Sequence, residues 1–317
     1  MKYLDFHADT LTEIKSGTLQ NNQNDIDLER VNQMSGNYVQ VFAIWKDAIS
    51  VKNKEKEFKQ LYRKAIALLA EEKADLELCL SFGDMDKALE MGKAAAFLAI
   101  EDISLMGNYV EQVRELGFRF AMLTWNYENE YAYGAAVDQE KGLKPQGRAL
   151  AQKLVQQEIV LDISHLSDAG AEEIFELTDR PVIASHSNVR DICNQPRNLK
   201  REHIQEIIAR KGVIGMNLYR PFVGSGTYVT IQDLLRHMDA ILTMDGEDTL
   251  VLGQDFDGCE GLFPEGITGV ESVPYIRGQM ERAGFGKRVI DKIFFENGYQ
   301  FMKRNLKGDK NDKQIII

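Results

Sequence analysis

Cysteine is scarce in this 317-residue chain, and the few cysteines form no motif. Cys79, Cys193 and Cys259 are widely separated, and no two have the C-x-x-C spacing of a zinc knuckle or a redox pair. We therefore expect neither a disulfide framework nor a thiolate metal site. We interpret all three as small side chains that are buried or half-buried.

Phosphate-binding glycine motifs and long apolar runs are also missing. The chain contains neither G-x-G-x-x-G nor G-x-x-x-x-G-K-[ST], so a nucleotide cofactor is not expected. The longest apolar run, Ala94–Ile100, is far shorter than the roughly 20 residues of a membrane helix. Charged residues within positions 1–9 interrupt the apolar core that a signal peptide needs, which predicts a cytoplasmic protein.

Basic charge is in deficit. Asp and Glu number 49 against 38 Lys and Arg, which gives a formal net charge of -11 at pH 7. That balance disfavours nucleic acid and anionic membranes as partners. Hydrophobic residues make up 44% of the chain, enough to bury a sizeable core, and no repeat or Gly/Ser linker divides it. We predict one domain over residues 1–317, with 306–317 as a mobile tail or a packing or dimer strand.

Strand and helix patterns alternate along the whole sequence. Eight runs are typical of strands: Tyr3–His7, Tyr38–Trp45, Ala95–Glu101, Phe118–Thr124, Ile159–Ser164, Val182–His186, Gly212–Asn217 and Leu250–Asp255. Helical patterns separate them, notably at Lys54–Glu72, Arg148–Gln157, Ala169–Leu177, Arg201–Arg210, Ile231–Met244 and Lys287–Asn305. This alternation predicts an α/β fold, the (β/α)8 TIM barrel, with a doubly wound open sheet as the alternative. Two polar insertions, Lys15–Asp27 and Asn126–Gln146, follow strands, where barrel enzymes carry active-site loops.

Ionisable side chains close five of the predicted strands. The carboxyl ends of barrel strands lie on one rim, where ligands bind, so we expect these groups to converge. Nitrogen and oxygen ligands without sulfur suit zinc or a similar divalent ion. Any one of them alone is as readily a satisfied polar strand end, and only the combination predicts a metal site. The residues are His7 and Asp9, Glu101, His165, His186 and Asp255.

Four other ionisable residues are expected outside the ligand set. His203 and His237 fall in amphipathic helical patterns beside charged residues, so we expect them on the surface or at its boundary, without a metal-binding role. Asp162 is better interpreted as a partner that orients an imidazole than as a ligand. Asp102 follows its neighbouring glutamate and should face the opposite side by strand alternation.

Six short motifs occur in order along the chain. They are His7-Ala8-Asp9, Ile100-Glu101, Asp162-Ile163-Ser164-His165, Ser185-His186-Ser187, Arg197-Asn198 and Asp255-Phe256-Asp257-Gly258. Each motif is weakly specific, but their order and strand placement together resemble the membrane (renal) dipeptidase family of amidohydrolase-type barrels. The resemblance runs from residue 5 to about residue 302, nearly the whole chain.

The resemblance implies a dinuclear zinc centre with two Zn²⁺ per chain. One ion would take His7, Asp9 and Glu101, and the second would take Glu101, His165 and His186, so that Glu101 bridges them. Two such ions can share a hydroxide, lower the pKa of the bound water to about 7 and polarise a carbonyl.

The resemblance also assigns roles to two residues beyond the ligands. Asp255 matches the family's catalytic aspartate, which accepts a proton from the bridging water and passes it to the leaving amine. Arg197 matches the arginine that grips a substrate carboxylate in a bidentate fork. A structural rim carboxylate is the less favoured alternative for Asp255, whereas Arg197, without the resemblance, is as readily a surface arginine.

One position departs from the family pattern. Where the mammalian enzyme has a histidine that contacts the scissile carbonyl, this chain has Trp125. Trp125 could form one wall of the pocket, and Asn126 could donate a hydrogen bond in place of the histidine. Asn217 and Tyr219, after the seventh strand, are weaker candidates for substrate contact.

We therefore predict a zinc-dependent dipeptidase in which a metal-bridged hydroxide attacks the peptide bond of a small dipeptide. Within the enzyme class, the alternative is hydrolysis of an N-acyl amino acid or a cyclic amide at the same centre. A non-catalytic metal- or ligand-binding barrel is a further alternative, but it should lack a ligand or the proton shuttle, and neither is missing. The resemblance leaves a homodimer open.

Overall fold

The computed structural model describes residues 1–34 and 36–308, so residues 309–317 of the predicted tail lie outside the described part of the chain. The strands are β1 (Lys2–Ala8), β2 (Asn37–Trp45), β3 (Leu76–Leu78), β4 (Ala94–Glu101), β5 (Phe118–Ala121), β6 (Val160–Leu161), β7 (Ile214–Met216) and β8 (Leu250–Leu252). Every pairing between these strands is parallel.

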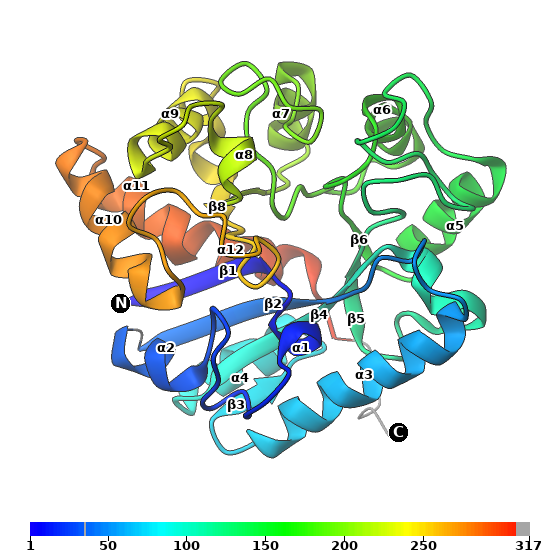
Figure 1. Cartoon of the computed structure of the whole chain (residues 1–317), viewed down its shortest axis with the longest axis horizontal. Coiled ribbons are helices and arrows are strands. Elements are labelled where there is room, and N and C mark those ends of the chain that lie inside the picture. Colours follow the sequence, from blue (N-terminus) through cyan, green and yellow to red (C-terminus); the bar gives the residue numbers. More distant parts are fainter. Residues whose placement is uncertain (35, 309–317) are drawn as a thin grey trace.

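The helices lie outside the sheet, with α3 on one side of the molecule and α9 and α10 on the other (Figure 1). They are α1 (Thr10–Glu13), α2 (Leu28–Met34), α3 (Lys54–Glu71), α4 (Phe82–Glu90), α5 (Pro145–Gln156), α6 (Asp168–Leu177), α7 (Arg201–Ala209), α8 (Arg220–Val223), α9 (Ile231–Leu242), α10 (Val273–Arg282), α11 (Lys287–Asp291) and α12 (Asn297–Asn305). Short 3₁₀ segments are η1 (Ile103–Gln112), η2 (Gly246–Asp248) and η3 (Val270–Ser272), and the π-helical η4 (Lys292–Glu296) joins α11 to α12. No helix in the described residues is both long and apolar enough to cross a membrane.

The sheet is curled, and seven of its strands follow the order β6-β5-β4-β2-β1-β8-β7, while β3 pairs with β4. Residues 183–184 contact both ends of this order. Ile183 forms a parallel bridge with Asp162, directly after β6, and Ala184 forms one with Ile214 in β7. The architecture is therefore an α/β fold with a curled parallel sheet, consistent with a (β/α)8 barrel.

Burial on both faces explains why the central strands are almost continuously apolar. Every residue of β4 is buried, and so are the seven inner residues of β2. In β1 the two faces differ. Phe6 packs against Phe301 of α12, with ring centroids 5.9 Å apart, while Asp5 and His7 lie on the opposite face by strand alternation. β1 thus carries polar groups into the inside of the curled sheet.

The structure differs from the sequence prediction at two places in the sheet. Of the predicted strand Val182–His186, only Ile183 and Ala184 form bridges, because the chain turns away after a single pairing on each side. β3 was not predicted, since its three residues, Leu-Glu-Leu, are too few to show a periodic pattern.

The prediction of surface positions for His203 and His237 is wrong, because both are buried, at 3% and 0% exposure. Position 237 lies on the apolar face of α9, between Leu234 and Ile241 in helical register. Both ring nitrogens of His237 form hydrogen bonds with backbone groups. Nδ1 accepts from the N–H of Val189 at 3.0 Å, and Nε2 donates to the carbonyl of Val223 at 2.9 Å.

Candidate metal centre and substrate site

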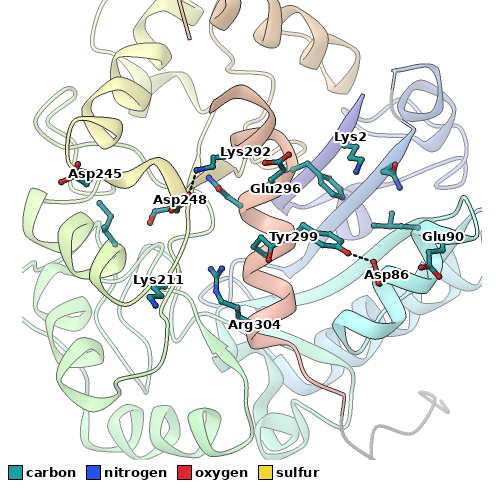
Figure 2. A pocket seen from close by; sticks show the side chains of 17 residues that line it. Lys2, Asp86, Glu90, Lys211, Asp245, Asp248, Lys292, Glu296, Tyr299 and Arg304 are labelled. Atoms are coloured by element: carbon teal, nitrogen blue, oxygen red, sulfur yellow. Dashed lines mark hydrogen bonds and ion pairs between the residues drawn. The ribbon is translucent and has the colours of Figure 1, made fainter. Parts of the chain in front are cut away.

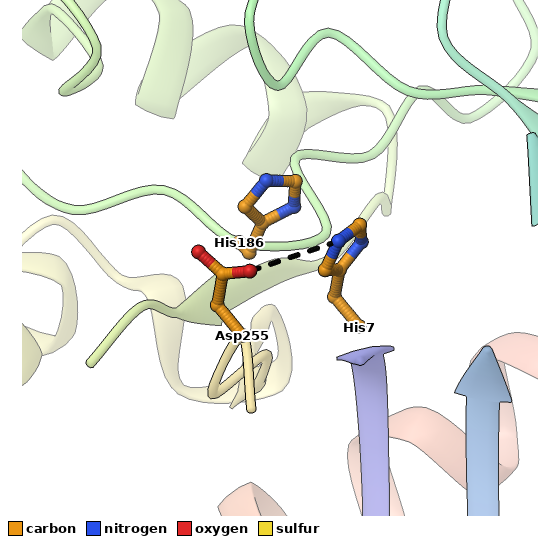
Figure 3. Close-up of side chains that lie close together, drawn as sticks. All are labelled: His7, His186 and Asp255. Carbon is orange, nitrogen blue, oxygen red and sulfur yellow. Dashed lines mark ion pairs between the residues drawn. The ribbon is translucent and has the colours of Figure 1, made fainter. Parts of the chain in front are cut away.

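In the described residues, three overlapping groups of side chains that could ligate a metal ion lie at the carboxyl ends of the strands. They are His7–Asp9–Glu101, Glu101–His165–His186 and His7–His186–Asp255, and within each group the ligand atoms lie within 4.8 Å of one another. Figure 3 shows the third group, in which the Asp255 carboxylate faces the His7 ring and His186 lies beside both. The structure thus brings together all five residues that were predicted as ligands, and Asp255 with them.

Glu101, the last residue of β4, lies between the two predicted ligand groups. Its Oε2 is 3.2 Å from Nε2 of His7, and its Oε1 is 2.7 Å from Nε2 of His165 and 3.8 Å from Nε2 of His186. The Nε2 atoms of the latter two histidines are 2.8 Å apart. One carboxylate oxygen therefore faces each group, which is the arrangement expected of a bridging ligand.

Buried polar atoms without partners indicate where cations would fit. Within the described residues, both ring nitrogens of His7, Oδ1 of Asp9 and Oε2 of Glu101 are buried and make no hydrogen bond. Leaving such atoms unpaired is costly, and nitrogen and carboxylate oxygen are the donors that zinc prefers. These donor atoms, which have no hydrogen-bond partner in the described residues, therefore fit divalent metal ions.

Gly258 keeps a space open between two carboxylates of this centre. A Cβ atom at this position would lie 2.3 Å from Oδ1 of Asp255 and 2.4 Å from Oδ2 of Asp9. Any side chain would therefore displace one or both carboxylates. The glycine of the Asp255–Gly258 motif is thus part of the site by virtue of the side chain it lacks.

The protonation equilibria of the cluster are strongly shifted. Burial, assisted by the positive charge of Arg197, lowers the pKa of His165 to about 3, and burial also lowers the pKa of His186 well below its usual value. Burial alone would raise the pKa of Glu101, but His7 and His165 outweigh it and lower that pKa. At neutral pH this favours two neutral imidazoles and an ionised carboxylate, the forms that bind metal.

In the group His7–Asp9–Glu101, the pKa values of His7 and Asp9 are raised rather than lowered. Burial, together with the charge of Glu101, raises the pKa of Asp9 well above its usual value. Burial lowers the pKa of His7, but the negative charges of Glu101 and Asp9 outweigh it and raise that pKa. Three ionisable groups packed this closely therefore favour any bound positive charge, whether a proton or a metal ion.

Two buried aspartates support the histidines through the backbone. Oδ1 of Asp5 accepts from the N–H of His7 at 2.9 Å. Oδ1 of Asp162 accepts from the N–H of Ser164 at 2.9 Å and of Ser185 at 3.1 Å, the residues that precede the two other histidines. Asp162 thus contacts the backbone rather than an imidazole. Asp5 was missed by sequence reasoning, although its position two residues before His7 places it on the same face.

Sharp backbone turns place the functional groups just past the strand ends. Four non-glycine residues at this rim have positive φ: Asp102 (69°), His165 (72°), Asp255 (60°) and Asp257 (67°). Such conformations cost energy and are typical of functional sites. The carboxylate of Asp102 points away from the centre. Its Oδ1 accepts from the N–H of Ser104 at 2.9 Å and from Nδ2 of Asn129 at 2.8 Å.

His165 and His186 face each other through Nε2, and Nδ1 of each ring also has a partner. Nδ1 of His165 lies 2.8 Å from Oδ1 of Asn126, and Nδ1 of His186 lies 2.7 Å from Oγ of Ser185. Such contacts fix the orientation and tautomer of a metal-binding imidazole. Asn126 was predicted to contact substrate, and the structure places its side-chain oxygen on the histidine. Ser185 was missed, and only its adjacency to His186 could have indicated it.

Arg197, Asn217 and Asp255 converge beside the histidines. Arg197 is buried, with Nε 3.0 Å from Nδ1 of His165 and Nη1 donating to Oγ of Ser187 at 2.9 Å. Nδ2 of Asn217 donates to Oδ2 of Asp255 at 2.9 Å. Burial, with the nearby negative charge of Glu101, raises the pKa of Asp255 to about 6.

Tyr219 and Trp125 border this region. Tyr219 precedes α8, and its N–H donates to Oδ1 of Asn217 at 2.5 Å. The Trp125 indole packs 5.9 Å from the ring of His165 and 5.1 Å from that of Trp45, measured between centroids. Trp125 therefore places an aromatic surface next to the group Glu101–His165–His186.

A large cavity lies away from this cluster. Its volume is about 880 Å³, and it is lined by residues near the amino ends of β1, β2 and β8 together with the helix at the end of the chain, among them Lys2, Asn37, Thr249 and Tyr299 (Figure 2). None of the residues in the three candidate metal groups lines it. Barrel enzymes place their chemistry at the opposite, carboxyl ends of the strands, where the histidine cluster lies.

Comparison with known proteins gives consistent matches. Residues 1–314 match the family described as membrane dipeptidase, peptidase family M19. The chain is 27% identical over 252 residues to an uncharacterised Klebsiella pneumoniae protein from the pqqA 5′ region, covering 74% of this chain and 91% of that protein. It is 28% identical over 190 residues to dipeptidase aclJ of Aspergillus oryzae, covering 58% of this chain and 45% of that protein.

Solved structures share the fold. A metallopeptidase from Rhodobacter sphaeroides, liganded with a phosphinate mimic of the dipeptide L-Ala-D-Ala, superposes with a TM-score of 0.82 at 21% identity, covering 96% of this chain and 99% of that one. A metallopeptidase named dipeptidase AC gives a TM-score of 0.86 at 21% identity, covering 97% of this chain and 99% of that one.

Proposed function

Because the chain belongs to the membrane dipeptidase family, peptidase family M19, we propose that it is a zinc-dependent dipeptidase with two ions per chain. One observation carries the proposal. The buried carboxylate of Glu101 turns one oxygen toward His7, at 3.2 Å, and the other toward His165, at 2.7 Å. A carboxylate shared in this way between two histidine groups is suited to bridging two cations.

The metal groups would divide the ligands between them. His7 and Asp9 would hold one ion with Oε2 of Glu101, and His165 and His186 would hold the other with Oε1. When bound, two such ions would acidify a water molecule between them and polarise the scissile carbonyl.

The remaining chemistry belongs to residues of the chain. Asp255, with a pKa raised to about 6 by burial, is suited to accept a proton near neutral pH and to return it to the leaving amine. Asn217 holds Oδ2 of that carboxylate at 2.9 Å and leaves Oδ1 directed toward His7, 3.8 Å from its Nε2. Arg197, buried beside His165, would bind the terminal carboxylate of a dipeptide.

The scaffold we propose is a closed (β/α)8 barrel forming one hydrolase domain. The bridges of Ile183 and Ala184 support closure, because they join the two ends of the seven-strand order. Backbone hydrogen bonds run to both sides of this segment: the Ile163 N–H donates to Ile183, and the Ala184 N–H donates to Val213. Residues 183–184 would then be a shortened eighth strand.

Metal analysis combined with hydrolysis assays tests the proposed function. The purified protein is expected to carry two equivalents of zinc and to hydrolyse dipeptides. Glu101→Ala and His165→Ala are expected to abolish hydrolysis while circular dichroism shows the fold retained. Full-rate hydrolysis by protein stripped of divalent metal would overturn the mechanism, and one equivalent of zinc would argue against Glu101 as a bridge.

The aromatic surface of Trp125 supports a second candidate. Trp125 packs between His165 and Trp45, so an apolar surface borders the centre where the mammalian family member has a histidine. Such a surface suits the acyl group of an N-acyl amino acid or a cyclic amide, which the same centre could hydrolyse. Comparing dipeptides of both L,L and L,D configuration with N-acyl amino acids separates the two activities.

A further inference from the structure

A second cavity lies on the same rim as the metal groups. Its volume is about 330 Å³, and it is lined by Asp102 and by residues from two segments, 47–54 and 125–130. Asp102 follows β4, and the two segments follow β2 and β5, so this rim cavity is formed by loops at the carboxyl ends of strands together with Lys54, the first residue of α3. Small-ligand pockets typically enclose about 300–1,000 Å³, so its size suits one amino-acid side chain.

Trp125 connects the rim cavity to the metal centre. The indole lines the cavity and packs 5.9 Å from the ring of His165, between centroids. Tyr127 also lines the cavity, with its ring 5.5 Å from that of Trp125. A group in the cavity can therefore contact two aromatic rings. Only the indole of Trp125 separates it from His165, a proposed metal ligand.

Negative charge dominates the lining. Four carboxylates, those of Asp47, Asp102, Glu128 and Glu130, line the cavity with one cation, Lys54. Glu128 also pairs with Lys144, outside the lining, at 2.6 Å, so two of the four negative charges remain in excess. The ammonium group of Lys54 is already engaged, at 2.9 Å from Oγ of Ser104 and 3.0 Å from Oε2 of Glu130. In the described part of the chain, the Asp47 carboxylate has one hydrogen bond, from the N–H of Ile49 at 3.1 Å, and no cationic partner.

The position of Arg197 fixes which part of a dipeptide could reach this cavity. Arg197 follows residues 183–184, which lie beyond β6 in the sheet, whereas the cavity loops follow β2, β4 and β5 on the other side of β6. A substrate whose terminal carboxylate binds Arg197 would extend across the metal groups. Its amino-terminal residue would then lie next to Trp125.

We propose that the rim cavity is the subsite for the side chain of the amino-terminal residue, and that it selects a cationic side chain such as lysine or arginine. The inference rests on the proposed dipeptidase function. Aromatic faces attract ammonium and guanidinium groups, and the surplus carboxylates around them add a second attraction. An acidic side chain in the same place would face only like charge.

A matched substrate panel tests this subsite. L-lysyl-alanine, L-norleucyl-alanine and L-glutamyl-alanine are compared, each with L- and D-alanine as the second residue. Norleucine has the aliphatic chain of lysine without the ammonium group. The expected order of kcat/KM is lysyl above norleucyl above glutamyl, with about a ten-fold preference for lysyl over norleucyl.

Variants locate the preference in the cavity. The double change Asp47→Asn with Glu130→Gln keeps the shape of the lining and removes two charges. It is expected to bring the lysyl-to-norleucyl ratio close to one. Glu111→Gln is the control, because Glu111 is 60% exposed, pairs with Lys153 and lies outside the lining. It is expected to leave activity and ratio unchanged.

The outcomes separate this inference from the proposed function. If none of the dipeptides is hydrolysed, the dipeptidase assignment falls, and the subsite falls with it. If dipeptides are hydrolysed but norleucyl or glutamyl peptides match lysyl peptides in the wild-type protein, only the subsite is wrong. That comparison needs no variant, so it decides the question even if the double variant fails to fold. A folded double variant that keeps the full preference would also overturn it.

Discussion

Asn126 and His165 are joined by a contact of 2.8 Å between the side-chain oxygen of one and Nδ1 of the other. Nε of Arg197 lies 3.0 Å from the same ring nitrogen. An imidazole nitrogen can donate or accept, but it cannot do both. If Nδ1 carries the proton, it donates to Asn126, and the lone pair of Nε2 faces Glu101 and His186. The Nε–H of Arg197 then has no acceptor in this ring and can turn to a substrate carboxylate, while Nη1 and Nη2 stay bound to Oγ of Ser187 and to the carbonyl of His186.

We therefore predict that Asn126 positions a metal ligand. Asn126→Ala should weaken binding of one of two metal equivalents by about 10- to 100-fold, because the orienting acceptor is lost. Asn126→Asp retains an acceptor oxygen and should restore most of that affinity. Competition titration with a chelating dye measures both, with circular dichroism as the check on folding. Unchanged affinity in the alanine variant would show that the contact has no orienting role.

Gly258→Ala should inactivate the enzyme while leaving the fold intact. The new Cβ would lie 2.3 Å from Oδ1 of Asp255 and 2.4 Å from Oδ2 of Asp9, so these carboxylates must move. Displacing catalytic groups by about 1 Å can cost roughly 100-fold in rate, and we expect a loss of kcat of at least that size. The backbone itself tolerates alanine, because the φ angle of Gly258 lies outside the left-handed region.

Gly278→Ala is the matched control for that experiment. This glycine lies in α10, and nothing lies within 4 Å of a Cβ built there. Alanine should keep full activity and raise the free energy of unfolding by up to about 1 kcal/mol, because glycine is a poor helix former. Equal activity of the two variants would show that the space beside Gly258 is not needed.

The strand-end groups were predictable because parallel strands deliver successive carboxyl ends to one rim. His7, Glu101, His165 and His186 all follow apolar runs that are long enough or β-branched enough to identify. The contact of Asn126 with His165 was not, because it depends on how the 126–146 insertion folds back, with the Ala135 N–H donating to the carbonyl of His165 at 2.7 Å. Local periodicity carries no information about such a contact.

The buried histidines show a second limit. Charged neighbours suggested a surface position for His237, but its ring bonds to backbone groups of residues 189 and 223, which are distant in sequence. Similarly, residues 183–184 hold their place in the sheet through single bridges to partners on either side, too short a pairing for its bounds to appear in the sequence.

Removing metal should lower both activity and thermal stability. Prolonged dialysis against a chelator is expected to abolish dipeptide hydrolysis and to reduce the melting temperature, because ligands that bind only the folded state stabilise it by about 2.7 kcal/mol at 100 times Kd. Two equivalents of zinc should restore both properties. Calorimetry and kinetics on the same samples measure this. A melting temperature that does not respond to chelation and reloading would contradict a buried metal centre.

The ion pair of Asp168 with Arg190 should stabilise the protein in a pH-dependent way. The Asp168 carboxylate is 6% exposed and accepts from two Arg190 nitrogens, at 2.6 and 2.8 Å, and from Nζ of Lys200 at 2.9 Å. Burial raises the pKa of Asp168, but the two cations outweigh it and lower that pKa below its ordinary value. Asp168→Asn should lower the free energy of unfolding at pH 7 by about 3 kcal/mol, because it leaves a partly buried arginine without its anion.

The sign of the pH effect follows from the lowered pKa. The unfolded chain binds a proton at Asp168 near the ordinary value of about 3.9, and the folded chain binds it only at lower pH. The stabilisation is therefore fully present above that value and is lost as the pH falls toward the folded pKa, so the wild-type advantage should narrow below about pH 4. Urea unfolding at a series of pH values measures this difference in stability.

Glu172→Gln is the control. Its carboxylate is 59% exposed and 3.9 Å from Nζ of Lys200, so the loss in free energy of unfolding should stay below about 1 kcal/mol. A difference between wild type and Asp168→Asn that is independent of pH would mean that the loss arises from packing rather than charge.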